Sequence, residues 1–145
     1  MTEAFREYFA FMEQLGQLLD RLTELEQEKT DAVRHDDLLG VDECMKQEQA
    51  LSLSLRAMDR KRDTLLGGMG LRDVNLSGLV QHCPEEIRPE AKAAAEKLRD
   101  RYRLYRSAAD VARTTLECNL HQIERLLENG VNFPMERGAF ADIRA

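Results

Sequence analysis

The sequence has no tryptophan, three prolines, eight glycines and no continuous apolar run of the length that crosses a membrane. A membrane-spanning helix needs about 20 predominantly apolar residues, so we expect no membrane insertion. Proline and glycine interrupt helices, and their scarcity leaves long stretches that helices can occupy. The N-terminus shows no basic stretch followed by an apolar core, and it therefore predicts no secretory signal.

Cysteine is also scarce, and the 27 acidic residues outnumber the 21 basic ones. Cys44, Cys83 and Cys118 are odd in number and form no Cys-X-X-Cys pair. Free thiols in a reducing cytosol are the simplest interpretation, so we expect a cytoplasmic protein. The net charge is −6. An acidic chain gains nothing from the general attraction of phosphates, so we expect no nucleic-acid partner.

The sequence is rich in apolar residues spaced three and four apart, the pattern of helices packed lengthwise. Three long segments show it, over about 2–34, 36–67 and 86–129. The first has a broad apolar stripe, which predicts contact with two neighbouring helices. Asp36 or Asp37 is a candidate N-cap for the second segment.

A short helix is expected in the connection between the second and third segments, within 71–84, with Asn75 as its candidate cap. No sustained alternation of period two predicts a strand. The predicted fold class is therefore all-α. Because short connections join the long helices, neighbouring helices should pack antiparallel. The expected architecture is an elongated antiparallel bundle of three long helices plus one short helix. It forms a single domain over 1–130, followed by an irregular apolar C-terminal tail over 131–145.

Polar residues interrupt the apolar spacing. Lys29 falls in the first segment, Glu48 and Arg62 in the second, and Asn119 in the third. A polar residue facing a neighbouring helix costs stability and commonly fixes register or meets another polar group. For Asn119 an alternative stays open, in which a slight rotation of the helix turns Leu120 inward instead.

No arrangement of residues predicts catalysis. The sequence contains no nucleophile or phosphate-loop motif, and its acid pairs suit solvated faces and helix caps. Cys118 and His121 are three residues apart, but zinc needs at least three ligands, and His82 with Cys83 lies far away in sequence. We therefore expect no enzyme activity, no metal and no cofactor.

The segment 97–106 carries five bases and two tyrosines, and it is the best candidate for a nucleic-acid contact. The alternative is a surface of ion pairs within the chain, with partners such as Glu13 on the first helix. Tyr102 and Tyr105 fall on the predicted apolar stripe. We expect both to be buried and unable to stack on bases.

Residues 18–66 combine a leucine-rich first helix ending in acids, an aspartate near the turn, a Lys-Glu pair, leucines and an arginine in the closing turns. These features are Glu24, Asp36 or Asp37, Lys46 with Glu48, Leu51, Leu55 and Arg62. In this combination residues 18–66 resemble the FlgN family of flagellar export chaperones. The last helix, with Asn119 before leucine-rich turns, and the ending AFADIRA (139–145) are also similar.

The resemblance implies a chaperone that holds hook-associated proteins, which form the hook–filament junction, in the cytosol before type III export. Such chaperones bind the C-terminal helical segments of these clients and prevent premature assembly. Components of the export apparatus are further candidate partners, and a monomer or weak homo-oligomer is expected. The alternative function is a structural coiled-coil protein that self-associates and has no export role.

An apolar helical groove accepts an amphipathic client helix, and apolar residues gather toward the end of this chain. We therefore predict that the client binds the C-terminal half of the last helix and the tail. Two alternatives remain open: these residues pack on the first two helices, or the tail covers the groove until a client displaces it. The predicted contact residues are Leu116, Leu120, Ile123, Leu127, Val131, Phe133, Phe140 and Ile143.

Overall fold

A computed structural model of the chain describes residues 2–128, apart from the side chains of Ile123, Leu126 and Leu127. Within this range the chain forms helices and no strand, which confirms the all-α class. None of these helices combines the length and apolar character that a membrane crossing requires. The elements are α1 (Thr2–Arg34), α2 (Leu38–Gly68), α3 (Leu76–His82), the 3-10 turn η1 (Glu85–Ile87) and α4 (Arg88–Glu128).

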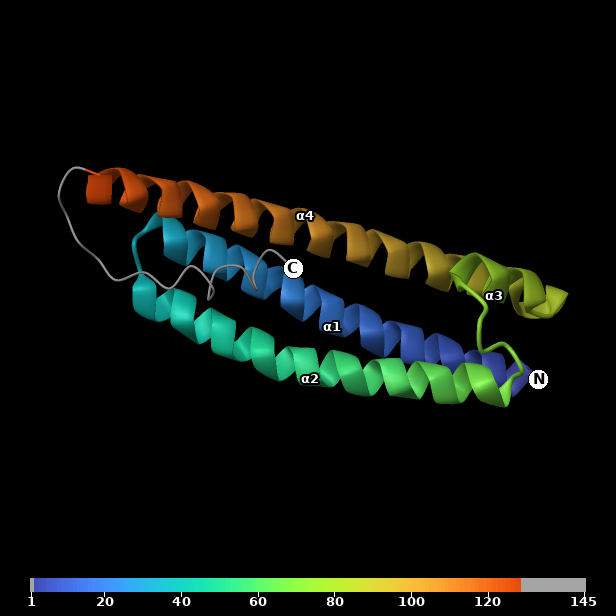
Figure 1. Cartoon of the computed structure of the whole chain (residues 1–145). Helices are drawn as coiled ribbons and strands as arrows, with labels where there is room; N and C mark the ends of the chain where they lie inside the picture. The colour runs from blue at the N-terminus through green and yellow to red at the C-terminus, as the bar shows by residue number, and fades with distance from the viewer. Residues whose placement is uncertain (1, 129–145) are drawn as a thin grey trace.

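The three long helices lie alongside one another, with α3 and η1 at one end (Figure 1). A tight turn after Arg34 makes α2 antiparallel to α1. In contrast, α4 runs in the same direction as α1. Glu13 pairs with Lys97 near one end, and Val33 shares a cavity with Leu116 near the other.

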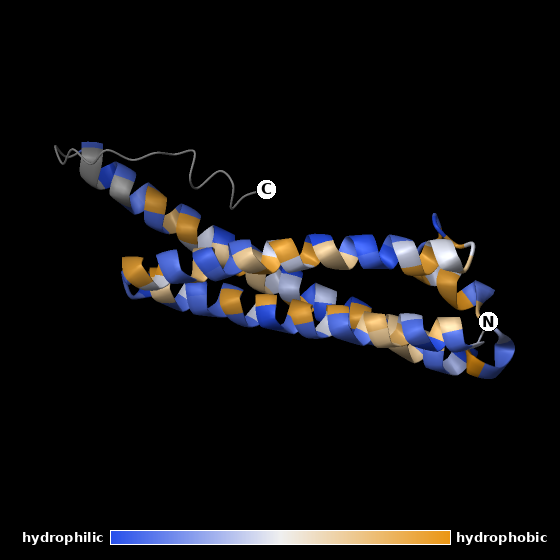
Figure 2. Ribbon diagram, turned by 90° about the horizontal axis from the view of Figure 1, so that it is seen from below, coloured by the Kyte–Doolittle hydropathy of each residue, from blue (hydrophilic) through white to orange (hydrophobic). Residues whose placement is uncertain are grey.

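The central helix is α1, because it packs against both α2 and α4 while these two make few direct contacts with each other. The broad apolar stripe of the first segment predicted two neighbours, and this prediction is confirmed. Figure 2 shows hydrophobic and hydrophilic positions alternating along the long helices, as amphipathic helices require.

The largest apolar core lies around the N-terminal half of α1, where α3, η1 and the first turns of α4 close over it. Ala91 and Ala95 are almost fully buried there, and their small side chains let α4 approach α1 closely. The buried members of this core are Phe5, Tyr8, Phe11, Met12, Leu66, Leu71, Leu79, Cys83, Ile87, Ala91 and Ala95.

The turn between α1 and α2 has a defined hydrogen-bond pattern. The amide of Asp37 donates to the Ala32 carbonyl at 2.8 Å, and the amide of Asp36 donates to the Val33 carbonyl at 3.2 Å. Asp36 takes the left-handed conformation that this C-terminal motif demands, with φ 53°. The motif reverses the chain and places two carboxylates side by side at this end of the molecule.

Side-chain caps start the two helices that follow a turn. The Asp37 carboxylate accepts a hydrogen bond from the Gly40 amide at 2.9 Å, so Asp37, rather than Asp36, is the N-cap of α2. The Asn75 side chain accepts from the Gly78 amide at 2.7 Å and caps α3, as predicted. These bonds satisfy backbone donors that a helix start leaves unpaired.

One prediction about α4 is wrong: Tyr102 is 49% exposed rather than buried. The inward position belongs to its neighbour Arg101, whose side chain crosses Gly16 of α1 and pairs with Glu13 and Asp20. A Cβ at Gly16 would collide with the Arg101 guanidinium, so the absence of a side chain creates this crossing. Spacing alone predicted an apolar contact where the helices use an ion pair.

The C-terminal end of α4 extends beyond the turn between α1 and α2 (Figures 1 and 2). Asn119 still lies beside that turn. The nine residues from there to Glu128 add about 13 Å at about 1.5 Å per residue. The last turns of α4 therefore lie beyond the end of α1 and the start of α2.

Candidate partner-binding site

An apolar cavity of about 320 Å³ opens where the α1–α2 turn meets the C-terminal half of α4. All three long helices contribute to it, so its shape depends on how they pack. We call it the turn cavity. Its lining residues are Ala32, Val33, Asp36, Asp37, Leu38, Val41, Asp42, Met45, Leu116 and Asn119.

The structure places part of the predicted contact set at or near this cavity. Leu116 lines it and is 8% exposed, while Leu120, one turn further along α4, is equally buried. Ile123 and Leu127 fall within the last turns of α4. The remaining predicted residues lie outside the described residues, and they are Val131, Phe133, Phe140 and Ile143.

Sequence reasoning missed the contribution of α1 and α2 to the turn cavity. Val33, Val41 and Met45 line it, because the tight turn brings the end of α1 and the start of α2 alongside α4. The available signal was Asn119, a polar residue on the predicted apolar stripe. Asn119 lines the cavity and is half-buried, while Leu120 is buried, so both residues face inward to some degree.

Acidic side chains and an exposed leucine surround the mouth of the turn cavity. Asp36, Asp37 and Asp42 all line it, and Leu38 is 79% exposed beside them. Gly40 allows the start of α2 to lie close to the end of α1. A Cβ there would stand 3.3 Å from the Cβ of Ala32 and would collide with the Asp37 carboxylate.

A charged cluster, largely buried, joins the C-terminal part of α1 to the N-terminal half of α2. Lys29 is 1% exposed, and its Nζ lies 2.6 Å from Glu48 Oε1 and 3.0 Å from Glu26 Oε2. The two polar interruptions of the apolar spacing, Lys29 and Glu48, are therefore partners. Burying one of them alone would be costly, and the pair compensates for that cost.

The cluster holds two carboxyl groups for one ammonium group, and their pKa values respond to this imbalance. Burial raises the pKa of Glu26 to about 7, a hydrogen bond with Glu48 adds to the rise, and the charge of Lys29 opposes it. Burial alone would lower the pKa of Lys29. Its contacts with Glu48 and Glu26 outweigh burial, so the pKa of Lys29 lies above the ordinary value.

Two further titratable groups lie near the cluster. Burial, with the negative charges of nearby glutamates, raises the pKa values of the Cys44 thiol and the Tyr105 hydroxyl. A thiol with a raised pKa holds its proton and is a poor nucleophile at neutral pH. Cys44 is 6% exposed and fills space between α1 and α2.

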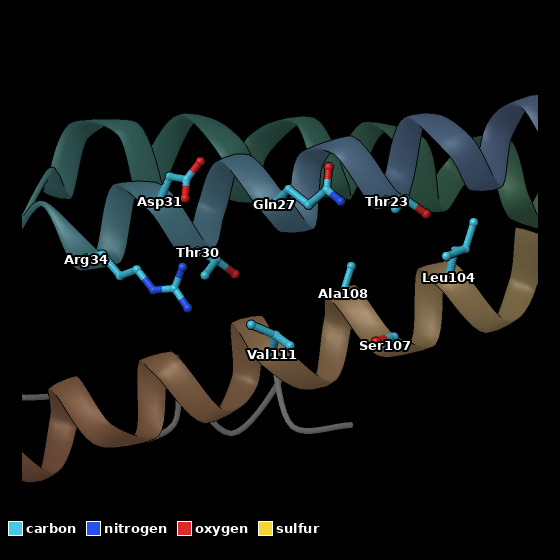
Figure 3. Close-up of a pocket in the computed structure, with 9 residues that line it drawn as sticks. All are labelled: Thr23, Gln27, Thr30, Asp31, Arg34, Leu104, Ser107, Ala108 and Val111. Atoms are coloured by element: carbon cyan, nitrogen blue, oxygen red, sulfur yellow. The ribbon is translucent and has the colours of Figure 1, made fainter.

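A second concavity, of about 360 Å³, lies between α1 and α4 (Figure 3). The α1 side is polar and includes Asp31 and Arg34, while the α4 side includes the exposed residues Leu104 and Val111. This surface is open and carries charges of both signs. It therefore offers a partner less apolar enclosure than the turn cavity does.

The basic segment 97–106 forms ion pairs within the chain. Lys97 and Arg101 both pair with Glu13, each at 3.2 Å, as the intramolecular alternative predicted. Hydrogen bonds from Arg101 and Lys97 lower the pKa of Glu13. Arg103 pairs with Asp100 on the same helix at 3.3 Å. Much of the positive charge of this segment thus has a partner on α1 or α4.

The residues considered for a metal site do not converge. Cys83 is buried just before η1, whereas Cys118 is exposed near the other end of α4. The 30 residues between Arg88 and Cys118 correspond to about 45 Å of helix. Across residues 2–128 there is no group of three or more His, Cys, Asp or Glu side chains that could hold a metal ion.

Comparison with known proteins identifies a family that includes a chain of this kind. The model of the FlgN protein family matches residues 1–129, which include every helix described above. No curated protein and no solved structure matches the chain. The family match covers far more than half of the sequence, and it agrees with the resemblance of residues 18–66. The chain belongs to the FlgN family of flagellar export chaperones.

Proposed function

We propose that this chaperone holds the C-terminal helical segments of hook-associated proteins in the cytosol and prevents their assembly before type III export. The client helix lies along the C-terminal half of α4 and inserts an apolar side chain into the turn cavity. Masking the apolar face of the client helix removes the surface through which clients self-associate. The chaperone itself acts as a monomer or weak homo-oligomer.

The turn cavity is the observation that carries this proposal. Its volume of about 320 Å³ lies at the lower end of the range typical of ligand pockets, about 300–1,000 Å³. Transfer of one large apolar side chain from water into such a site contributes about 1.5–3 kcal/mol. Leu38 at the mouth is 79% exposed, so an incoming helix can cover apolar surface that now faces solvent.

The proposed contact surface continues from the cavity along α4 and into the residues that follow it. Because the last turns of α4 extend beyond the α1–α2 turn, a client helix can reach them without displacing α1 or α2. Leu116, which lines the cavity, and Leu120 are the described members of this proposed contact set, and each is 8% exposed. The proposed continuation comprises Ile123, Leu127, Val131, Phe133, Phe140 and Ile143.

Isothermal titration calorimetry tests this function with synthetic C-terminal segments of the hook-associated proteins from the same genome. We expect reversible binding to the full chain, weakened about five- to tenfold by Leu38→Ser, which corresponds to about 1–1.4 kcal/mol. The matched control is Leu53→Ser. Leu53 is also on α2 and is 64% exposed, but it does not line the turn cavity.

Three outcomes would contradict the proposal. Absence of binding by the full chain would show that these segments are not its clients. Equal effects of the two serine variants on the dissociation constant would show that the turn cavity is not part of the binding site. Light scattering that finds a tight oligomer at every concentration, with no client binding, would favour the self-association alternative.

A further inference from the structure

We infer that the client helix carries lysine or arginine next to the apolar side chain that enters the turn cavity. This inference rests on the proposed function and adds a charge pattern to it. The observation behind it is that one mouth combines apolar walls with three carboxylates, from Asp36, Asp37 and Asp42. A partner must match both properties to bind there.

The backbone holds the first of these carboxylates in place. Asp36 adopts φ 53°, and its amide donates a hydrogen bond to the Val33 carbonyl. The turn therefore fixes the direction of the Cα–Cβ bond of Asp36. Its side chain is exposed, and within residues 2–128 no cation pairs with it. A negative charge therefore stands at the mouth without a partner from the described chain.

The other two carboxylates retain capacity for a further cation. One oxygen of Asp37 accepts from the Gly40 amide, and a carboxylate has room for several more donors. Asp42 pairs with Lys46 at 3.0 Å on the same helix, but both side chains are more than 60% exposed. Such exposed pairs are weak, and a partner cation can replace or join Lys46.

The concavity between α1 and α4 provides an internal contrast. It carries Asp31 and Arg34 in the same lining, so charges of both signs face a ligand there. In the turn cavity all charged lining residues are acidic. Charge complementarity across an interface selects partners and suppresses wrong ones, so of these two concavities the turn cavity is the one that favours a basic helix.

The test uses two designed 20-residue helical peptides with the same apolar stripe, one flanked by lysines and the other by glutamates. Fluorescence anisotropy measures their dissociation constants with the full chain, the Asp36→Asn/Asp42→Asn variant and the Asp59→Asn/Asp63→Asn variant. The last is the matched control, because it removes the same charge from the far half of α2. A C-terminal client segment, measured in parallel, reports on the proposed function itself.

We expect the lysine peptide to bind the unmodified chain at least tenfold more tightly than the glutamate peptide. The Asp36→Asn/Asp42→Asn variant should reduce this preference about three- to tenfold, since each exposed charge pair contributes little. The control variant should keep most of the preference. Higher salt should also weaken it, because the charges are exposed to solvent.

The outcomes separate the inference from the proposed function. Client binding without any preference between the two peptides would overturn the inference and leave the function intact. Failure of the client segment and of both peptides to bind would overturn both. If a Phe133→Ser/Phe140→Ser variant bound both peptides more tightly, with no charge preference, the chain's own residues 129–145 would be the occupant, and the inference would be wrong.

Discussion

The two helices that flank α1 are held to it in different ways. Of the 31 residues of α2, only Cys44 and Leu66 are buried. Between them the contact with α1 consists of half-buried apolar side chains, the Lys29–Glu48 ion pair, and hydrogen bonds from Arg21 to Gln47 and from Lys61 to Gln14. In contrast, α4 places small buried residues such as Ala95 and Ala112 against α1, and the most enclosed of its side chains that pair with α1 is that of Arg101, which crosses Gly16.

This difference indicates that α2 depends largely on a few polar contacts with α1, of which the Lys29–Glu48 ion pair is the most buried, whereas α4 depends more on close packing of small side chains. Close packing of small side chains is insensitive to pH and salt, but a buried ion pair is sensitive to the loss of either partner. We therefore expect α2 to be the helix that responds first to changes in charge. Because α2 also forms one wall of the turn cavity, such a response would reach the proposed binding site.

The largest predicted effect follows from Lys29→Met. This change leaves the buried Glu26 and the half-buried Glu48 without a cation, and we expect it to lower the free energy of unfolding by about 3–5 kcal/mol at pH 8. Urea denaturation followed by circular dichroism measures the loss. The matched change on the other flank is Lys97→Met, which removes an ion pair whose lysine is 59% exposed. An exposed pair contributes about 0–1 kcal/mol, so equal losses in the two variants would refute the comparison.

A smaller effect concerns pH. The pKa of Glu26 is about 7 in the folded chain and about 4.5 in the unfolded chain. Between these values the folded state binds more protons than the unfolded state, so the free energy of unfolding falls as pH rises. The contribution of Glu26 is complete below about pH 4.5 and is lost by about pH 7. The expected loss is on the order of 3 kcal/mol.

The Glu26→Gln variant isolates this effect, because glutamine keeps the size of the side chain and does not titrate. Urea denaturation between pH 5 and 8 should show a smaller decrease in stability for the variant than for the unmodified chain. Lys29, Glu48, Glu28, Cys44 and Tyr105 surround or influence the same region, and all remain in the variant. Identical pH profiles for the two proteins would show that Glu26 is ionised in the folded state.

Much of the helical organisation could be predicted from the sequence, because it depends on local rules. Apolar spacing predicted the three long helices to within a few residues. Side-chain capping by Asp37 and Asn75 marked two helix starts. The prediction failed at Tyr102, where spacing cannot distinguish an apolar contact from the Arg101 crossing that a glycine on another helix makes possible.

The candidate site was only partly predictable, for a related reason. Leu116 could be identified because it belongs to a regular stripe on one helix. The walls provided by Val33, Val41 and Met45 depend on which residues face each other across a turn and between helices. The pairing of Lys29 with Glu48 has the same origin: each residue was visible as an interruption, but their proximity required the register of α1 against α2.

The smallest predicted effect separates the stability of the turn from its proposed role in binding. Asp36 has φ 53°, a conformation that glycine adopts more readily than aspartate. The corresponding position after α2 is occupied by Gly70, with φ 71°. Asp36→Gly should therefore raise the free energy of unfolding by at most about 1 kcal/mol, since the extra freedom of glycine in the unfolded chain offsets part of the gain.

Asp36→Asn removes the same charge but keeps a side chain, so the difference in stability between the two variants reports the backbone strain alone. If the carboxylate serves the client, both variants should weaken binding of the lysine-flanked peptide to the same extent, although only the glycine variant is more stable. Weaker binding by one variant alone would mean that the backbone of the turn, rather than its charge, controls access to the cavity.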